Sequence, residues 1–150
     1  RIDGLESDSK YVFQYVKNME LRNAKITTKD ALWETENVTV YDSELNGEYL
    51  GWHSRNLRLV NCHITGEQPL CYARDLVLEN CTFGPECDRA FEYSSVRATI
   101  NGPISGVKNP SSGCIIAESY GDIILDENIK APADCELKLR DEQTCFSDCV

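Results

Sequence analysis

The chain has 150 residues, of which 41% are hydrophobic and 27% charged, and this composition fits one folded domain with a buried core. Its 25 acidic and 15 basic residues give a formal charge of −10. That charge argues against nucleic acid or an anionic membrane as partner, because both need a basic surface. No apolar run approaches the ~20 residues that a membrane-spanning helix needs.

A short phrase recurs four times in the first half of the chain, at residues 17–26, 36–45, 55–64 and 74–83. Apolar and polar residues alternate within each copy, as in RNLRLVNCHI (55–64), which indicates two short strands joined by a bend. The copies follow one another at a fixed period of about 19 residues, and a constant period of this size is typical of a solenoid. Because no 3.6-residue pattern is present, we predict a parallel β-helix rather than a leucine-rich repeat.

The repeat is carried by columns of equivalent residues. The bend columns are Asn18, Asn37, Asn56, Asp75 and Asn23, Asp42, Asn61, Asn80. The apolar columns are Met19, Val38, Leu57, Leu76, then Leu21, Val40, Leu59, Leu78, then Ile26, Leu45, Ile64, Phe83. Asparagine and aspartate suit tight bends because they tolerate the left-handed conformation, and stacked amides can bond to one another as an asparagine ladder. The alternative, a row of calcium ligands, has too few carboxylates.

Aromatic residues recur between the copies, at Trp33, Trp52, Tyr72 and Tyr93. We expect a third strand of the coil near residues 48–54 and group these four rings as one column. The residues two positions earlier, Ala31, Leu50, Leu70 and Phe91, should share their face. We expect that face to be core; the alternative is an external stacking ladder suited to sugar rings.

The whole chain, 1–150, is expected to form a single β-helix domain. Regular coils are expected over about residues 1–100. Looser terminal coils and an irregular cap are expected over about 101–150, where CIIAES, DIILDE and CELKLR resemble strands. Ile2 falls one repeat period before Leu21, so the chain enters partway along a coil. We therefore expect a preceding segment of a longer β-helix, or a partner chain such as a second copy, to cover an open N-terminal end.

The cysteine and histidine pattern indicates no cofactor and no metal site, because Cys-x-x-Cys and zinc-finger spacings are missing. Cys62 and Cys81 occupy one repeat position and should be stacked core residues. Cys145 and Cys149 are expected to be exposed. Free thiols favour a reducing compartment, and we expect a cytoplasmic location. His63 should be a surface residue, and His53 could face a groove.

Several strings together, GEYLGW (47–52), QPLCY (68–72) and AFEYS (90–94), resemble the DUF3737 family of bacterial proteins of unknown function, over about residues 12–130. The resemblance implies a right-handed parallel β-helix that is usually longer than this chain and usually lacks a secretion signal. It implies no catalytic residue.

Three functional hypotheses remain open. The first is a non-catalytic scaffold or binding module with a carbohydrate-like ligand surface, an oligosaccharide lying on a strip formed by Glu48, Trp52, Gln68, Tyr72, Glu92 and Tyr93. The second is a polysaccharide-active enzyme, a lyase or glycoside hydrolase, whose site needs N-terminal coils absent here. The third is an assembly module that pairs through the open N-terminal end.

Overall fold

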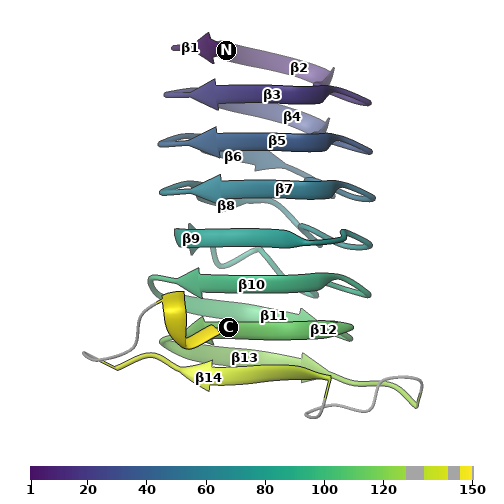
Figure 1. Cartoon of the computed structure of the whole chain (residues 1–150), viewed down its shortest axis with the longest axis vertical. Helices are drawn as coiled ribbons and strands as arrows, with labels where there is room; N and C mark the ends of the chain where they lie inside the picture. The colour runs from purple at the N-terminus through teal and green to yellow at the C-terminus, as the bar shows by residue number, and fades with distance from the viewer. Residues whose placement is uncertain (128–133, 142–145, 150) are drawn as a thin grey trace.

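The strands of the chain stack in parallel as a β-solenoid of about 7 turns, ~19 residues apart. The computed structural model describes residues 1–127, 134–141 and 146–149. Figure 1 shows the stack with the N-terminus at one end of its long axis. The predicted parallel β-helix is confirmed. Among the described residues, no helix has the length and apolar character needed to cross a membrane.

One sheet runs the length of the stack, and a second runs along its N-terminal coils; the two meet at β9 (Leu76–Phe83), which pairs with β7 at one end and with β8 at the other. Besides β9, sheet A contains β1 (Ile2–Asp3), β3 (Lys17–Arg22), β5 (Glu36–Tyr41), β7 (Arg55–Val60), β10 (Ser95–Ile100), β12 (Ser112–Ala117) and β14 (Cys135–Leu139). Sheet B contains β2 (Glu6–Val12), β4 (Lys25–Ala31), β6 (Glu44–Gly47) and β8 (His63–Thr65). A separate pair is formed by β11 (Pro103–Lys108) and β13 (Ser119–Ile124), and a 3-10 turn, η1, spans Phe146–Cys149.

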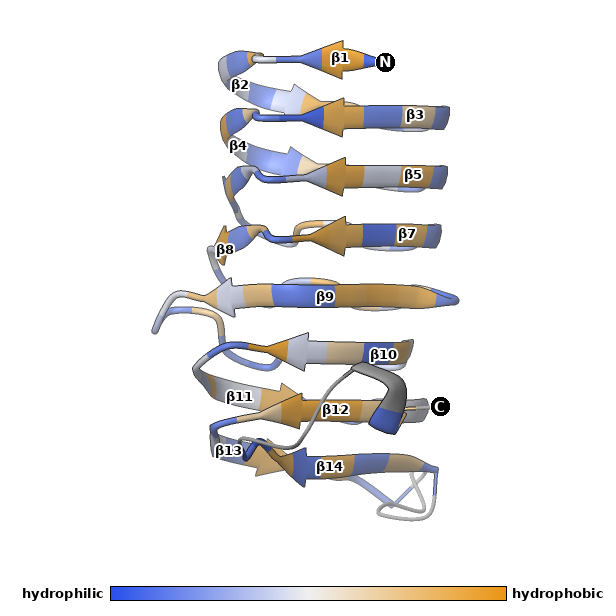
Figure 2. Ribbon diagram, turned by 60° about the vertical axis from the view of Figure 1, so that its left-hand side comes forward, coloured by the Kyte–Doolittle hydropathy of each residue, from blue (hydrophilic) through white to orange (hydrophobic). Residues whose placement is uncertain are grey.

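The core consists of the inward columns of both sheets. Leu21 lies opposite Val40, Val40 opposite Leu59, and Leu59 opposite Leu78, and all four are fully buried. Ile26, Leu45 and Ile64 form the facing column from sheet B. Figure 2 shows apolar residues recurring at the same places along β3, β5 and β7. Burial of each such side chain contributes roughly 1.5–3 kcal/mol, so the repeated phrase supplies most of the apolar stabilisation of these coils.

The bend columns adopt the conformation that their residue types favour. All eight residues have positive φ, between 52° for Asn23 and 57° for Asn18. Their side chains also bond from coil to coil: Asn56 Nδ2 donates to Asn37 Oδ1 at 2.7 Å, and Asn61 Nδ2 donates to Asp42 Oδ1 at 3.2 Å. The left-handed bends expected from the Asn and Asp columns are confirmed.

The third strand expected near residues 48–54 is wrong, because this segment forms turns. Tyr49, Gly51 and His53 all have positive φ, which interrupts the extended conformation at every second residue. The same replacement of strand by turn occurs at residues 32–35, 66–73 and 84–94. We call these four segments the turn side of the solenoid.

Coils continue beyond residue 100 with variable length. Ser95 of β10 pairs with Ser112 of β12, and Gly113 of β12 pairs with Cys135 of β14. The strands expected near 114–119, 122–127 and 135–140 are present as β12, β13 and β14, although β13 begins earlier and ends at Ile124.

The cysteines confirm one expectation and correct another. Cys62 and Cys81 are buried in the core, as expected for stacked small residues. Cys149 is not an exposed thiol: it is 1% exposed and forms a disulfide with Cys114. Contacts of η1 with β10 and β12 bring these two cysteines together, a pairing that their 35-residue separation does not reveal. Cys145 lies outside the described residues.

Candidate functional site

The turn side is built from backbone that turns at alternate residues. Leu32, Leu70 and Phe91 have φ of 60°, 63° and 67°, and all three are fully buried. A left-handed residue without special side-chain chemistry costs about 1–2 kcal/mol. Burial of these large side chains offsets that cost, and so do backbone bonds between coils such as Leu70 N to Leu50 O at 2.6 Å.

The left-handed turns place four rings on the surface. Trp33 and Trp52 stack with centroids 5.6 Å apart and an interplanar angle of 9°. Their indole nitrogens donate to backbone carbonyls of the next coil, Trp33 to Tyr49 and Trp52 to Gln68, each at 2.7 Å. His53 stacks on Tyr72 with centroids 5.0 Å apart at 10°. The rings therefore form an external ladder in which ring faces pack on one another.

The expectation that the aromatic column is core is wrong. Leu50 and Leu70 are fully buried, whereas Trp52 and Tyr72 are half-buried and Tyr93 is 38% exposed. The left-handed residues make adjacent side chains point the same way, so the period of two on which the expectation rested does not hold here.

The four aromatic residues that the sequence groups in one column, Trp33, Trp52, Tyr72 and Tyr93, belong to two registers of the solenoid. His53 N donates to Cys71 O and Tyr72 N to Glu92 O, which aligns His53, Tyr72 and Tyr93. The other register aligns Trp33 and Trp52 with Cys71 and Glu92 on the following coils. Burial raises the pKa of the Cys71 thiol to about 12, so this position is an inert core thiol.

Four of the six residues of the expected strip are linked by contacts: Trp52 Nε1 donates to Gln68 O, Trp52 packs on Tyr72, and the rings of Tyr72 and Tyr93 have centroids 5.9 Å apart. Trp52 and Tyr72 contact each other edge to face at 5.2 Å. Glu48 is exposed, and its charge acts on Asp30 of β4. With its oxygen turned toward the guanidinium, the Gln68 amide accepts from Arg89 Nη1 at 2.9 Å.

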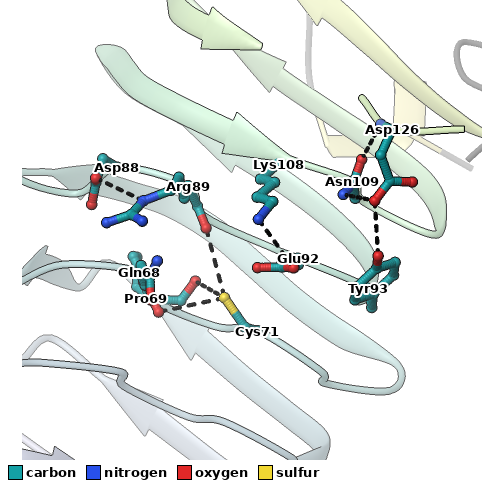
Figure 3. Close-up of polar contacts among 10 residues, drawn as sticks. All are labelled: Gln68, Pro69, Cys71, Asp88, Arg89, Glu92, Tyr93, Lys108, Asn109 and Asp126. Carbon is teal, nitrogen blue, oxygen red and sulfur yellow. Dashed lines mark hydrogen bonds and ion pairs between the residues drawn. The ribbon is translucent and has the colours of Figure 1, made fainter. Parts of the chain in front are cut away.

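The remaining strip residues are held by C-terminal coils, as Figure 3 shows. Glu92 pairs with Lys108 at 3.4 Å, and the Tyr93 hydroxyl donates to Asp126 at 3.0 Å. That hydrogen bond raises the pKa of the Tyr93 hydroxyl. Asn109, fully buried, donates to the same Asp126 carboxylate at 2.8 Å. These contacts fasten β11 and the segment that follows β13 to the turn side.

A hollow of about 440 Å³ lies where the turn side meets sheet A. The residues that line it are Tyr15, Lys17, Glu34, His53, Ser54, Arg55, Tyr72 and Arg74. They come from four successive coils. One wall is the register Tyr15, Glu34, His53, Tyr72, the other is the register Lys17, Arg55, Arg74, and Ser54 lies between the walls. His53 thus faces a groove, whereas His63 is an exposed residue of β8 that contacts Thr82 Oγ1 at 2.6 Å.

The walls differ in their bonding. Glu36, in the basic register, pairs with Lys17 at 3.6 Å on one side and with Arg55 at 3.4 Å on the other. No carboxylate among the described residues pairs with Arg74. Burial and the charge of Glu92 raise the pKa of the Tyr72 hydroxyl, so this group remains a proton donor at neutral pH. Ser54 is fully buried, and its hydroxyl bonds to none of the described groups.

Of the strip residues, only Tyr72 lines the hollow. The sequence did contain a signal for the basic wall, because Lys17, Arg55 and Arg74 are in step with the repeat. Arg55 follows Lys17 by two repeat periods, and Arg74 follows Arg55 by one.

The family model described as protein of unknown function (DUF3737) matches residues 1–138. The chain belongs to the DUF3737 family. No curated protein and no solved structure matches the sequence.

Proposed function

We propose that this DUF3737 chain is a non-catalytic scaffold that binds a carbohydrate-like ligand in the hollow beside the turn side. The observation that carries the proposal is the hollow itself, an open space of about 440 Å³ with rings on one wall and hydrogen-bond donors on the other. Rings and planar donors are the groups that hold sugar rings and hydroxyls in place.

The position of Tyr15 supports the proposal. Its side chain is 68% exposed, and no ring contact involves it among the described residues. An exposed tyrosine whose ring stacks on no other described ring can offer a ring face to a ligand. Trp52 supports the site from behind through its edge contact with Tyr72.

The lining is better suited to binding than to hydrolysis. Glu34 is the one carboxylate among the eight lining residues, whereas most glycoside hydrolases place a pair of carboxylates about the bond they cleave. A polysaccharide-active enzyme is the alternative, and it would have to complete its site with groups outside this lining.

The test is calorimetric titration with a panel of oligosaccharides, followed by analysis of the mixtures for new reducing ends. We expect binding that Tyr15→Ala and Tyr72→Ala weaken, and no new ends. Tyr11→Ala is the matched control, because Tyr11 is also exposed in the first coil but lies outside the hollow. Failure of every saccharide to bind, or equal weakening by Tyr11→Ala, would contradict the proposal, and new reducing ends would favour the enzyme.

A second candidate, self-association through the first coil, rests on a specific observation. In the described chain, β1 pairs only with β3 and β2 pairs only with β4, so each has one open edge. Leu5 O accepts from Lys25 N, so the backbone groups of Leu5 point toward β4. Because the backbone groups of successive strand residues point to opposite sides, the N–H of Asp8 points toward the open edge.

The second candidate predicts concentration-dependent dimers in sedimentation experiments. Asp8→Pro, which removes an outward N–H and keeps the ladder to β4, should abolish them. A monomer at all concentrations would remove this candidate.

A further inference from the structure

We infer that the ligand of the hollow is an acidic saccharide, and that Arg55 and Arg74 together hold its carboxylate or sulfate group. This inference rests on the proposed function and specifies its ligand class. It begins from a local reversal of charge. The chain as a whole carries −10, but three basic side chains and one acidic side chain line the hollow. Local charge of opposite sign to the rest of the surface attracts an anionic ligand to that point.

The two arginines are placed in direct register. An isolated parallel bridge pairs Arg55 with Arg74 on adjacent coils, and adjacent strands lie about 4.8 Å apart. Like charges directly opposite each other in a sheet are destabilising, so this pair weakens the empty protein. An anionic group that accepts from both guanidinium groups would remove the repulsion.

Other arginines of the same sheet are neutralised within the chain. Arg58, on β7 with Arg55, pairs with Glu79 at 2.9 Å, and Arg22 pairs with Glu20 at 2.6 Å. Arg55 shares Glu36 with Lys17, which leaves that trio with an excess of positive charge. Positive charge is therefore left uncompensated at the hollow, where the two guanidinium forks can bind planar oxyanions.

The ring geometry favours an acidic saccharide over a neutral one. Tyr72 and His53 pack their faces against each other, so they present edges and polar atoms to the hollow rather than open faces. The Tyr72 hydroxyl is a donor at neutral pH. Tyr15 remains as the ring with a free face, which suits a sugar ring next to the charged group.

The test compares four probes by calorimetric titration: an oligouronate, its neutral methyl ester, a sulfated oligosaccharide and inorganic sulfate. We expect the oligouronate or the sulfated oligosaccharide to bind, and the ester to bind at least roughly tenfold more weakly, since hydrogen bonds to charged groups contribute about 1.5–3 kcal/mol. Affinity should fall as salt is added. The two acidic saccharides distinguish a carboxylate from a sulfate as the bound group.

Three outcomes would overturn the inference. Equal binding of the ester and the acid would leave the proposed carbohydrate site intact and remove its acidic specificity. Binding of inorganic sulfate as tight as that of the saccharides would indicate an anion site without saccharide recognition. Binding of none of the four would overturn this inference, and the wider oligosaccharide panel would then decide the proposed function separately.

Variants locate the charge. Arg74→Gln should weaken the acidic saccharide at least roughly tenfold, and Arg74→Lys should restore part of the affinity because it keeps the charge without the fork. Lys29→Gln is the matched control, since Lys29 is an exposed cation of β4 outside the hollow. Equal loss in Lys29→Gln would mean that overall charge, and not this site, attracts the ligand.

Discussion

At the scale of single residues, the left-handed bends set where each coil turns. Asn56 combines a φ of 53° with an amide bond to Asn37 at 2.7 Å. Asn56→Ala should lower the free energy of unfolding by about 1–2 kcal/mol, because alanine is strained in this conformation. Urea unfolding measures the change.

The control for this prediction is Asn46→Ala. Asn46 is also an exposed asparagine, but it lies in β6 and has no positive φ. Its substitution should change stability by less than ~0.5 kcal/mol. Equal effects at the two sites would contradict the importance of the bend conformation.

Glycine is required where one coil approaches the backbone of the next. A Cβ on Gly113 would lie 1.8 Å from Val96 O, and its φ is 110°. Gly113→Ala should therefore destabilise the chain by at least about 3 kcal/mol. Gly102→Ala, with a φ of 143° but no atom within 4 Å of a new Cβ, should cost only the conformational part, about 1–3 kcal/mol. Thermal unfolding of the two variants should separate them, and equal losses would contradict the close approach.

Asp30 provides a prediction about pH. It is 8% exposed, one of its oxygens bonds to none of the described groups, and burial raises its pKa above the ordinary value of 3.8. The folded state thus holds the proton more tightly than the unfolded state. The free energy of unfolding attributable to Asp30 therefore falls as the pH rises from the unfolded-state pKa to the higher folded-state pKa. Asp30→Asn should be more stable than the parent at pH 7, and the advantage should disappear near pH 3.

The comparison needs unfolding curves of both proteins at the two pH values. Asp8→Asn, at an exposed position of β2, controls for the loss of one charge. An advantage of Asp30→Asn that is unchanged at pH 3 would show that hydrogen bonding of the amide, and not burial of the carboxylate, is responsible.

At the scale of elements, pairing between β7 and the segment entering β9 sets two arginines against each other. Arg74→Gln should stabilise the unliganded protein by about 0.2–0.5 kcal/mol, because it removes a like-charge pair. Arg58→Gln is its counterpart on β7 and should destabilise by a similar amount, because it breaks the pair with Glu79. Chemical unfolding of both variants is the measurement. A loss above about 1 kcal/mol in Arg74→Gln would assign Arg74 a structural role.

The strands could be predicted from the sequence because their inward columns alternate strictly and recur once in every coil, as Leu21, Val40 and Leu59 do. The turn side could not. Leu32, Leu70 and Phe91 are left-handed residues of types that carry no turn signal, and tertiary burial overrides their local preference.

The hollow lies beside the strip expected from the sequence and shares only Tyr72 with it, for a related reason. The sequence spacing groups Tyr72 with Trp52, but the backbone bonds align Trp52 with Cys71 and His53 with Tyr72, which is a difference of one residue. The steps from Trp52 to Tyr72 and from Tyr72 to Tyr93 are both longer than the repeat period, so the spacing alone does not reveal this difference. The hollow depends on this register, since it aligns His53 with Tyr72 and Arg55 with Arg74. The disulfide between Cys114 and Cys149 likewise needed the coil geometry, because nothing local links the two residues.

At the scale of the whole molecule, the candidate site depends on how neighbouring coils align, because its residues come from several coils. Each coil contacts mainly the coils beside it, so a surface that spans four coils exists only when their registers agree. The hollow draws Lys17, Glu34, Arg55 and Arg74 from four different coils. The repeated bends and core columns hold those registers, and the residues lining the hollow come both from the turn side and from sheet A with its flanking residues.

The most direct test of this account is a ¹⁵N–¹H NMR titration of the chain with the saccharide that binds best. If the ligand binds in the hollow, the perturbed amides should cluster there, at Tyr15, His53, Arg55, Tyr72 and Arg74, and sheet B residues such as Lys29 and Glu44 should not shift. Shifts confined to sheet B or to the C-terminal coils, or no shifts at saturating ligand, would contradict it.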